Sequence, residues 1–361
     1  MPRRKTKVIK IGNIYIGGNN PIAIQSMAKT KTADIEKTIA QIKNLQKAGC
    51  EILRVAVKDI YDARAIKKIR PKIKIPLVAD IHFDWRLAIE AIENGADKIR
   101  LNPGNIYKQH EIEAIVAALK RQKIPLRIGV NSGSLRDLNS KRLSLSDKLV
   151  ASAMDYIKTV ERLKFYDMVI SLKGSDVADT VSAYRKIAKL CDYPLHLGVT
   201  ATGLPRQGAV KSSIAIGALL LEGIGDTIRV SLTAGPEQEV RVAKAILEAL
   251  GLRHFGPEII SCPTCGRCEV DLIKIVKELE SRLSVIPACR SGRDYRLSTR
   301  LPKVAVMGCV VNGPGEAKGA DIGIAFGKKE GLLFKKGKAI KKISSAACVN
   351  TLLKEMERGY D

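Results

Sequence analysis

The first 250 residues alternate between short apolar runs and longer stretches in which apolar residues recur every three or four positions. The short runs are rich in Val, Ile and Leu, as expected of parallel strands that are buried on both faces. They cover residues 21–27, 51–57, 75–81, 97–103, 125–131, 167–173, 195–200 and 226–232. The pattern therefore predicts eight strands in one continuous array.

Amphipathic helices are predicted between these strands. Residues 33–48 are typical of a capped helix, because Asp34 stands near the start and Gly49 follows the end. Similar patterns cover residues 84–94, 146–163, 177–190, 209–221 and 238–250. Eight strands with eight following helices over about 250 residues are typical of a TIM (β/α)₈ barrel. A doubly wound open sheet is the alternative, but a single uninterrupted array favours closure.

The alternation of short apolar runs and amphipathic stretches ends after residue 252. We therefore predict two domains, a barrel over 1–252 and a smaller domain over 253–361. In the second, helices are expected at 269–283 and 344–356, and strands at 301–311, 321–326 and 332–334. The first of these strands enters a Gly-Pro-Gly turn, and residues 284–300, rich in Arg and Ser, are typical of a surface loop. The predicted class is thus α/β, with a TIM barrel followed by a small α+β domain.

Polar side chains gather at the ends of the predicted strands, where TIM barrels carry their chemistry. Five strands end with a cation: Arg54, Arg100, Arg127, Lys173 and Arg229. Other polar residues there are Gln25, Ser26, Asp80, His82, Asn102, Asn131, Ser171, His196, Thr200 and Ser231. A single arginine at a strand end is most often an ion-pair partner, but five converging cations repel one another. A multiply charged anion removes that repulsion, so we expect a phosphate or diphosphate substrate.

The composition adds a strong positive charge. The 361 residues include 62 Lys and Arg against 37 Asp and Glu, a net charge of +25. Such a field attracts nucleic acid, phosphorylated substrates and acidic proteins. Because the basic residues are spread along the chain and no arm combines them with aromatics, we do not expect nucleic-acid binding. No apolar run approaches the roughly 20 residues that cross a bilayer, and no signal-peptide core follows the basic N-terminus, so a cytoplasmic protein without a membrane partner is expected.

Cysteines concentrate in the second domain. Five of the eight in the chain are Cys262, Cys265, Cys268, Cys289 and Cys309. In a cytosolic chain of this size, such clustering suggests a metal rather than disulfides. The C-x-x-C pair at 262 and 265 suits zinc, an iron–sulfur cluster or a redox dithiol, although a dithiol lacks its usual βαβ context. Cys309 lies in a glycine-rich loop that could approach a cluster closely, and spacing alone leaves zinc and iron–sulfur open.

Several motifs follow one another in the order of a known family. They are PIAIQSM at 21–27, PLVADIHFD at 76–84, RLNPGN at 100–105, RIGVN at 127–131, HLGVT at 196–200, GAVKS at 208–212, GIGDTIRVS at 223–231, CPTC at 262–265 and GCVVNGPGE at 308–316. Each motif is weak by itself, but the whole ordered set is specific. The chain resembles the 4-hydroxy-3-methylbut-2-enyl diphosphate synthase family of non-mevalonate isoprenoid biosynthesis, over almost its whole length.

The resemblance implies a TIM barrel followed by a domain with a [4Fe–4S] cluster. In this family three cysteines and one glutamate hold the cluster, which here implies Cys262, Cys265, Cys309 and Glu316 as metal ligands. A carboxylate is a hard, exchangeable ligand on a cluster otherwise bound by thiolates. It can leave and open one iron to a substrate oxygen, so Glu316 is also an expected catalytic residue.

The resemblance also implies a reaction: reductive ring opening and dehydration of 2-C-methyl-D-erythritol 2,4-cyclodiphosphate to 4-hydroxy-3-methylbut-2-enyl diphosphate, by an iron–sulfur oxidoreductase. The expected substrate-binding residues are Arg54, Arg100, Arg127, Asn131, Lys173, Arg229 and Ser231. Asp80, His82 and His196 are the expected proton-handling residues. Reduced flavodoxin or ferredoxin would supply electrons, and both are acidic, which suits the net charge of +25. The family is dimeric, with the barrel of one subunit facing the cluster of the other.

Three features depart from the family pattern. Ala201 stands where the family usually has a glutamate thought to act on the substrate, Cys268 is an extra cysteine expected to be a bystander, and the 284–300 segment is long. A relative that keeps the cluster but has lost turnover is therefore one alternative. A basic barrel protein with a zinc module that binds nucleic acid is another.

Overall fold

The computed structural model describes residues 2–135, 143–285, 302–328 and 330–357. The chain divides into two compact units, Met1–Arg253 and His254–Asp361, and each is described by itself. In the part of the chain so described, no helix is long and apolar enough to cross a membrane.

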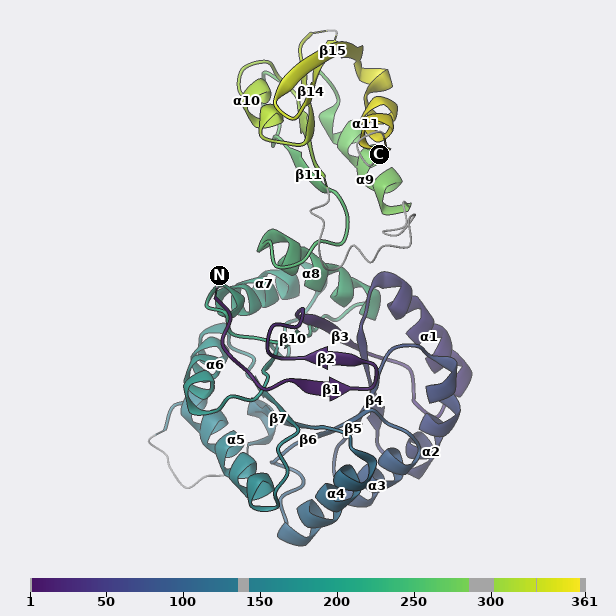
Figure 1. The fold of residues 1–361 in the computed structure, drawn as a ribbon, viewed down its shortest axis with the longest axis vertical. Coiled ribbons are helices and arrows are strands. Elements are labelled where there is room, and N and C mark those ends of the chain that lie inside the picture. Colours follow the sequence, from purple (N-terminus) through teal and green to yellow (C-terminus); the bar gives the residue numbers. More distant parts are fainter. Residues whose placement is uncertain (1, 136–142, 286–301, 329, 358–361) are drawn as a thin grey trace. The chain divides into compact units, whose positions relative to one another are not determined.

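The first unit is a parallel barrel wrapped by helices (Figure 1). Its strands are β3 (Ala23–Met27), β4 (Ile52–Val57), β5 (Leu77–Ile81), β6 (Lys98–Leu101), β7 (Leu126–Asn131), β8 (Met168–Lys173), β9 (His196–Leu197) and β10 (Thr227–Ile228). They are ordered β8-β7-β6-β5-β4-β3-β10-β9, and a bridge between Ile170 and Leu195 joins β8 to β9 and closes the ring. The predicted TIM barrel is therefore confirmed.

A helix follows each barrel strand. These helices are α1 (Ile35–Ala48), α2 (Ile60–Ile69), α3 (Trp85–Glu93), α4 (Gln109–Gln122), α5 (Leu145–Arg162), α6 (Val177–Leu190), α7 (Pro205–Leu221) and α8 (Pro236–Ala249). α1 shows why the sequence predicts them: the Asp34 side chain accepts a hydrogen bond from the Lys37 N–H, and Gly49 ends the helix with a φ of 100°.

Strands β9 and β10 are shorter than predicted. Each keeps only two residues in the regular ladder, although residues 195–200 and 226–232 are apolar enough for longer strands. Beyond them the contact continues through single backbone bonds, such as that from the Thr200 N–H to the Gly174 carbonyl at 3.0 Å. The chain there carries polar residues over the barrel mouth, so regular pairing ends early.

A short hairpin seals the N-terminal end of the barrel. It pairs β1 (Ile9–Ile11) with β2 (Ile14–Ile16) and lies across the centre of the ring in Figure 1. Its isoleucines pack on the first inward side chains of four strands: Ala23, Ile52, Val78 and Val169. This apolar layer leaves the opposite end, at the C-terminal ends of the strands, for the polar residues.

Strand register then decides which polar side chains face the interior. Since successive side chains alternate between faces, residues two positions beyond the apolar layer also point inward. Gln25, Arg54, Asp80 and Ser171 follow that layer directly. Pairing places Lys98 opposite Val78, Arg100 opposite Asp80, and Arg127 opposite Arg100, on the same inward face. The interior above the hairpin is thus polar and mostly cationic.

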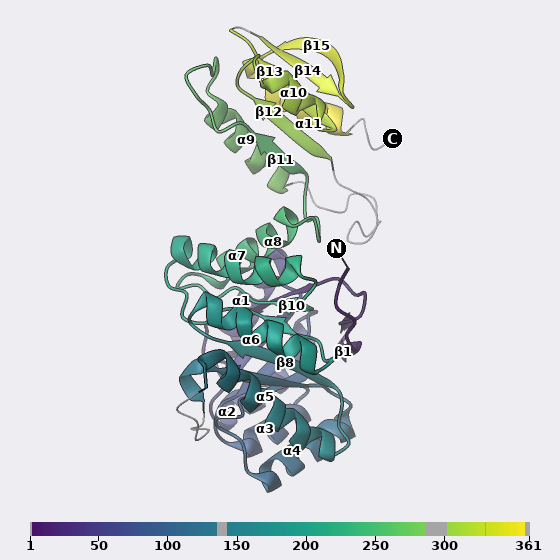
Figure 2. The ribbon, with the colours of Figure 1, turned by 90° about the vertical axis from the view of Figure 1, so that its left-hand side faces the viewer.

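The second unit is a mixed five-stranded sheet with helices on both faces (Figure 2). Its strands are β11 (Glu258–Ser261), β12 (Lys303–Met307), β13 (Ile322–Phe326), β14 (Glu330–Lys335) and β15 (Lys338–Ser344). α9 (Leu272–Val285) and α11 (Cys348–Glu357) cover one face, and α10 (Gly313–Lys318) covers the other. The α+β class holds, but β11, β15 and α10 were not predicted.

Local sequence explains two of these differences. Four of the seven residues of β15 are Lys or Ser and most are exposed, as is common for an edge strand that resists aggregation, so no apolar pattern marks it. α10 forms where a turn was expected, because proline is well tolerated in the first turn of a helix. α9 runs to Val285, and the rest of the predicted 284–300 loop, with Cys289, lies outside the described residues.

Candidate active site in the barrel and the cysteine loops

One carboxylate organises the centre of the barrel mouth. Asp80, at 3% exposure, accepts a hydrogen bond from Arg100 Nη1 at 2.9 Å and lies 3.6 Å from Arg54 Nε. Burial alone would raise the pKa of Asp80, but the charges of Arg54 and Arg100 hold it well below its usual value. Asp80 is therefore a permanent anion that positions two guanidinium groups. Its geometry suits a counter-ion rather than a proton donor.

Two acceptors on β7 support Arg100, and one of them, Asn131, is a predicted ligand. The Arg100 Nη2 group donates to the Gly129 carbonyl at 2.9 Å. In the amide orientation that satisfies both polar atoms, the Asn131 oxygen accepts from the same group at 3.0 Å. A Cβ atom on Gly129 would lie 2.6 Å from Arg100 Nε, so only glycine leaves room for this guanidinium.

Arg127 and Lys173 also lie in the interior but have no carboxylate partner among the described residues. Arg127, at 1% exposure, donates to the Gln25 side-chain oxygen at 2.7 Å. Burial first, and the neighbouring charge of Arg54 second, lower the pKa of both Arg127 and Lys173 well below their usual values. An additional anion would stabilise the charged form of both groups.

Arg229 and Ser231 form a second polar group with the first turn of α8. Arg229 donates to the Ser231 hydroxyl and to both carboxylate oxygens of Glu239 at 3.2 Å. Glu239 is buried and also accepts from Ser26 at 3.2 Å, and Lys29 Nζ lies 3.3 Å away from it. Glu239 was not predicted, since it begins a helix and no strand-end signal marks it.

The two predicted histidines differ in their surroundings. His196 is fully buried, with Nδ1 2.8 Å from the Thr227 hydroxyl and with no partner for Nε2 among the described residues. Burial and the nearby Arg127 lower its pKa far below the usual value, so the ring is neutral. His82 is partly exposed, and its buried Nδ1 likewise has no partner in the described chain. Ala201 is exposed in the left-handed region with a φ of 52°.

In the second unit, two loops bring cysteines together at the C-terminal ends of β11 and β12. Cys262 follows β11, and the Gly308 N–H lies 3.4 Å from its Sγ atom. Cys309 follows Gly308, and the backbone N–H groups of Val311 and Asn312 lower its pKa by hydrogen bonding its sulfur. This pairing of a stabilised thiolate with donated amides suits an iron–sulfur cluster.

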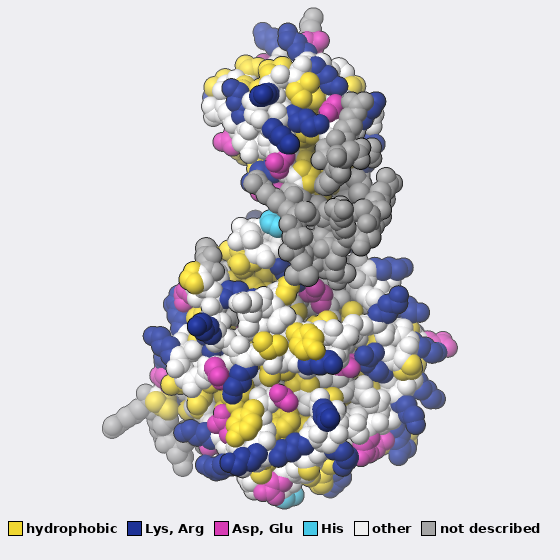
Figure 3. Space-filling view, viewed as in Figure 1, with side chains coloured by type: hydrophobic (Ala, Val, Ile, Leu, Met, Phe, Trp, Pro, Cys, Tyr) yellow, Lys and Arg dark blue, Asp and Glu magenta, His cyan; other side chains and the backbone are white. Residues whose placement is uncertain are grey.

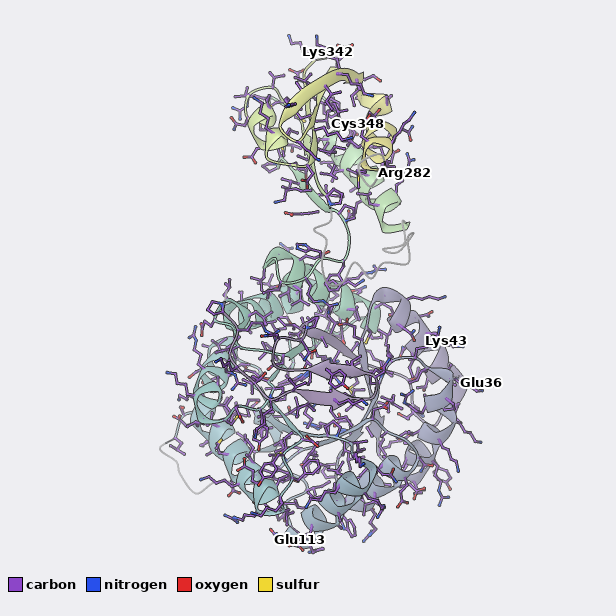
Figure 4. The ribbon with its side chains drawn as sticks, in the orientation of Figure 1. Glu36, Lys43, Glu113, Arg282, Lys342 and Cys348 are labelled. Carbon is purple, nitrogen blue, oxygen red and sulfur yellow. The ribbon has the colours of Figure 1, made fainter. Side chains whose placement is uncertain are left out.

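The remaining candidate ligands are less organised. Cys265 is exposed, and Glu316 is exposed on α10. Cys268 lies against the backbone of Gly308, where an added Cβ would come within 2.4 Å of its Sγ atom. Across the described residues, no three Cys, His, Asp or Glu side chains are arranged around a metal position. Cys348, buried at the start of α11, lies in the core of the unit (Figure 4).

The barrel thus brings together Arg54, Asp80, Arg100, Arg127, Asn131 and Lys173. Arg229 contacts Ser231 and pairs with Glu239. Sequence reasoning missed Lys98, a fully buried amine at the start of β6. The alternation of the strand could have found it, because Lys98 shares the inward face of Arg100.

Comparisons with known proteins agree along the whole chain. The GcpE TIM-barrel domain matches residues 6–244, and the GcpE protein C-terminal domain matches residues 258–358. A 4-hydroxy-3-methylbut-2-en-1-yl diphosphate synthase (flavodoxin) of Clostridium perfringens is 54% identical over 99% of both chains. The enzyme of the same name from Fusobacterium nucleatum is 52% identical, over 98% of this chain and 96% of its own.

The fold also resembles that of solved structures. A dihydropteroate synthase from Stenotrophomonas maltophilia matches with a TM-score of 0.53 at 13% identity, over 68% of this chain and 97% of its own. At that identity the likeness extends to the fold only. The two matching domains and the full-length relatives settle the assignment: this chain belongs to the GcpE family, the 4-hydroxy-3-methylbut-2-en-1-yl diphosphate synthases.

Proposed function

We propose that this chain is an iron–sulfur oxidoreductase that opens the ring of 2-C-methyl-D-erythritol 2,4-cyclodiphosphate reductively and releases 4-hydroxy-3-methylbut-2-enyl diphosphate and water. The observation that carries the proposal is the excess of buried cations in the barrel. Arg54 and Arg100 share Asp80, whereas Arg127 and Lys173 have no carboxylate partner in the described residues. A dianionic cyclic diphosphate would supply the missing negative charge.

The substrate-binding role falls to Arg54, Arg100, Arg127, Asn131, Lys173, Arg229 and Ser231. Contacts of Asp80 with Arg54 and Arg100, and of Asn131 with Arg100, support this assignment. His196 is neutral, and its Nε2 has no partner in the described residues, so it can exchange a hydrogen bond with an uncharged oxygen of the substrate. The Nδ1 atom of His82 likewise has no partner there.

A [4Fe–4S] cluster held by Cys262, Cys265, Cys309 and Glu316 would pass on, one at a time, the two electrons that the external donor supplies and the ring opening consumes. The donor set fits such a group, since thiols stand on adjacent loops and backbone amides stabilise the Cys309 thiolate. Cys268 is proposed as a bystander, because its Sγ atom is directed to the Val270 carbonyl at 3.2 Å.

Flavodoxin, the donor named for the relatives, is the proposed electron donor, with ferredoxin as the alternative. Both are acidic proteins, and the net charge of +25 favours their encounter. We further propose a homodimer, as the family resemblance implies; a monomer in analytical ultracentrifugation at micromolar concentration would contradict it.

Anaerobic purification followed by a turnover assay tests the function. The wild-type protein should be brown, hold about four iron and four sulfide per chain, and convert the cyclodiphosphate with a reduced mediator. Cys309→Ser should lose most of the iron, whereas Cys268→Ser should keep iron and turnover. A colourless wild-type protein with one zinc would reject the proposal. A full cluster without turnover would instead support a relative that has lost catalysis, for which Ala201 is the first position to restore as Glu.

A further inference from the structure

Two lysine amines lie buried in the barrel without an acidic partner among the described residues. Lys98 is 0% exposed, and its Nζ atom has no hydrogen-bond partner in the described chain. Lys173 is 7% exposed, and a Cβ atom on Gly198 would come within 2.9 Å of its Nζ. An unpaired ammonium group in such a place is costly, whereas a neutral amine is tolerated.

The groups that face these amines are almost all cationic. They are Arg54 on β4, Arg100 on β6, Arg127 on β7, Arg229 on β10 and the neutral His196 on β9. Asp80 is the only acidic residue that the eight strands carry, and two arginines already share it. Glu239 from α8 is bound to Arg229. No described carboxylate is therefore left for either lysine.

Only the lysines can respond to this crowding. A guanidinium group stays protonated in proteins, whereas a buried lysine readily gives up its proton. Burial first, and the arginine charges second, lower the pKa of Lys98 and Lys173 well below the usual value. A bound diphosphate reverses the balance, because its negative charge favours the ammonium forms.

We propose that Lys98 and Lys173 are a pair of proton acceptors in the barrel interior, neutral in the ligand-free barrel and protonated when a diphosphate binds. Each amine takes one proton from the solvent and becomes an ammonium group, and no bond of the ligand changes. Lys98 is then a positioning residue. Its ammonium charge strengthens the binding of the phosphates. The identity of the natural ligand in this inference rests on the proposed function.

Calorimetry of the oxidised holoenzyme without reductant tests the pair. The cyclodiphosphate is titrated at pH 8 in buffers of equal ionic strength but different ionisation enthalpy, and the slope of the binding enthalpy counts the protons taken up. The ligand has one strongly acidic oxygen on each phosphorus and does not titrate there. Wild-type protein should show net uptake, and Lys98→Met and Lys173→Met should each reduce it and weaken binding at least about tenfold.

Thermal unfolding separates this role from a structural one. Lys98→Met replaces an unpartnered amine with an apolar side chain of similar shape, so the ligand-free variant should melt at a higher temperature while its affinity falls. A merely structural Lys98 would give a lower melting temperature and unchanged affinity. Lys67→Met, at an exposed position of α2, is the matched control and should change neither.

The same titrations with inorganic pyrophosphate separate the pair from the proposed function. Comparing wild type with each variant cancels the titration of pyrophosphate itself. Suppose that pyrophosphate binding takes up more protons in wild type than in the variants, and that the cyclodiphosphate does not bind. The proposed substrate is then wrong, and the role of the two lysines is supported. Equal proton uptake in wild type and both variants would overturn the pair. Failure of both ligands to bind would overturn the anion site and the pair together.

Discussion

At the scale of the residue, one carboxylate determines how the barrel interior holds its charge. Asp80 contacts both Arg54 and Arg100, and Arg100 in turn reaches Gly129 and Asn131. Removing half of a buried ion pair leaves the other half unpaired in a medium that solvates charge poorly. Asp80 is therefore required first for folding and only then for binding.

Asp80→Asn should lower the free energy of unfolding by about 3 kcal/mol, because two buried guanidinium groups lose their counter-charge. Urea unfolding at pH 7 measures this loss, and added pyrophosphate should restore part of it. Asp155→Asn, on the exposed face of α5, should unfold like the wild type. Wild-type stability in Asp80→Asn would show that the two arginines need no internal counter-ion.

The buried amine of Lys98 gives a pH dependence with a defined sign. Its pKa is lowered in the folded protein, so between that value and 10.5 the unfolded chain binds a proton that the folded chain does not. Stability therefore rises with pH across this window, by up to about 1.4 kcal/mol per pH unit. Below the folded-state pKa, the full loss of stability from burying the protonated amine is present. Ligand-free wild type should gain more stability than Lys98→Met between pH 7 and pH 9 in urea titrations. Parallel curves would contradict the lowered pKa.

At the scale of the element, glycines in the strands make room for cations. Gly129 on β7 accommodates Arg100, and Gly198, directly after β9, accommodates Lys173. A barrel interior filled by β-branched side chains would have no space for such long groups. The β1–β2 hairpin complements this arrangement, since its isoleucines pack on the apolar side chains at the N-terminal ends of the strands.

Gly129→Ala should raise the KM for the cyclodiphosphate at least about tenfold, because the new methyl group displaces Arg100 from Asp80, and should cost about 1–3 kcal/mol of stability. Steady-state kinetics and urea unfolding measure the two effects. Gly217→Ala, in the helix α7 with open space at its Cβ position, is the control and should be neutral or slightly stabilising. An unchanged KM would mean that Arg100 does not touch the substrate.

At the scale of the whole molecule, the basic residues are spread along the whole sequence. The face of the barrel in Figure 3 carries Lys and Arg side chains among apolar and acidic ones. Figure 4 shows Glu36 and Lys43 projecting outward from α1, Glu113 from α4, and Lys342 from β15. A dispersed net charge of +25 suits long-range attraction of an acidic electron donor more than a single docking patch.

Reaction with reduced flavodoxin should therefore slow as salt is added. Raising the ionic strength from about 0.01 M to 0.5 M shortens the screening length from about 30 Å to a few ångströms, so kcat/KM for flavodoxin should fall at least about tenfold. Turnover with an uncharged reduced mediator is the control and should change little. A rate for flavodoxin that ignores salt would contradict electrostatic steering.

The sequence by itself determined the fold class, the order of the units and the family. Apolar runs of strand length and capped helices predict the barrel, and the motif set predicts the family, because both are local patterns. β15 was missed because its lysines give it the polar pattern of a solvent-exposed segment. α10 was missed because its first residues, Gly-Pro-Gly, are also typical of a turn.

Only the tertiary structure decided which charges are paired. Five cations at strand ends are visible in the chain. Not visible are Asp80 as the counter-ion of Arg54 and Arg100, Glu239 beside Arg229, and the Lys98 amine without a partner in the described residues. Arg100 contacts Asp80 across 20 positions of the chain, and Ser26 contacts Glu239 across 213. The strength of such contacts depends on burial, which no local pattern contains. The sequence predicts that the barrel binds an anion. The structure shows which buried cations lack a carboxylate partner among the described residues.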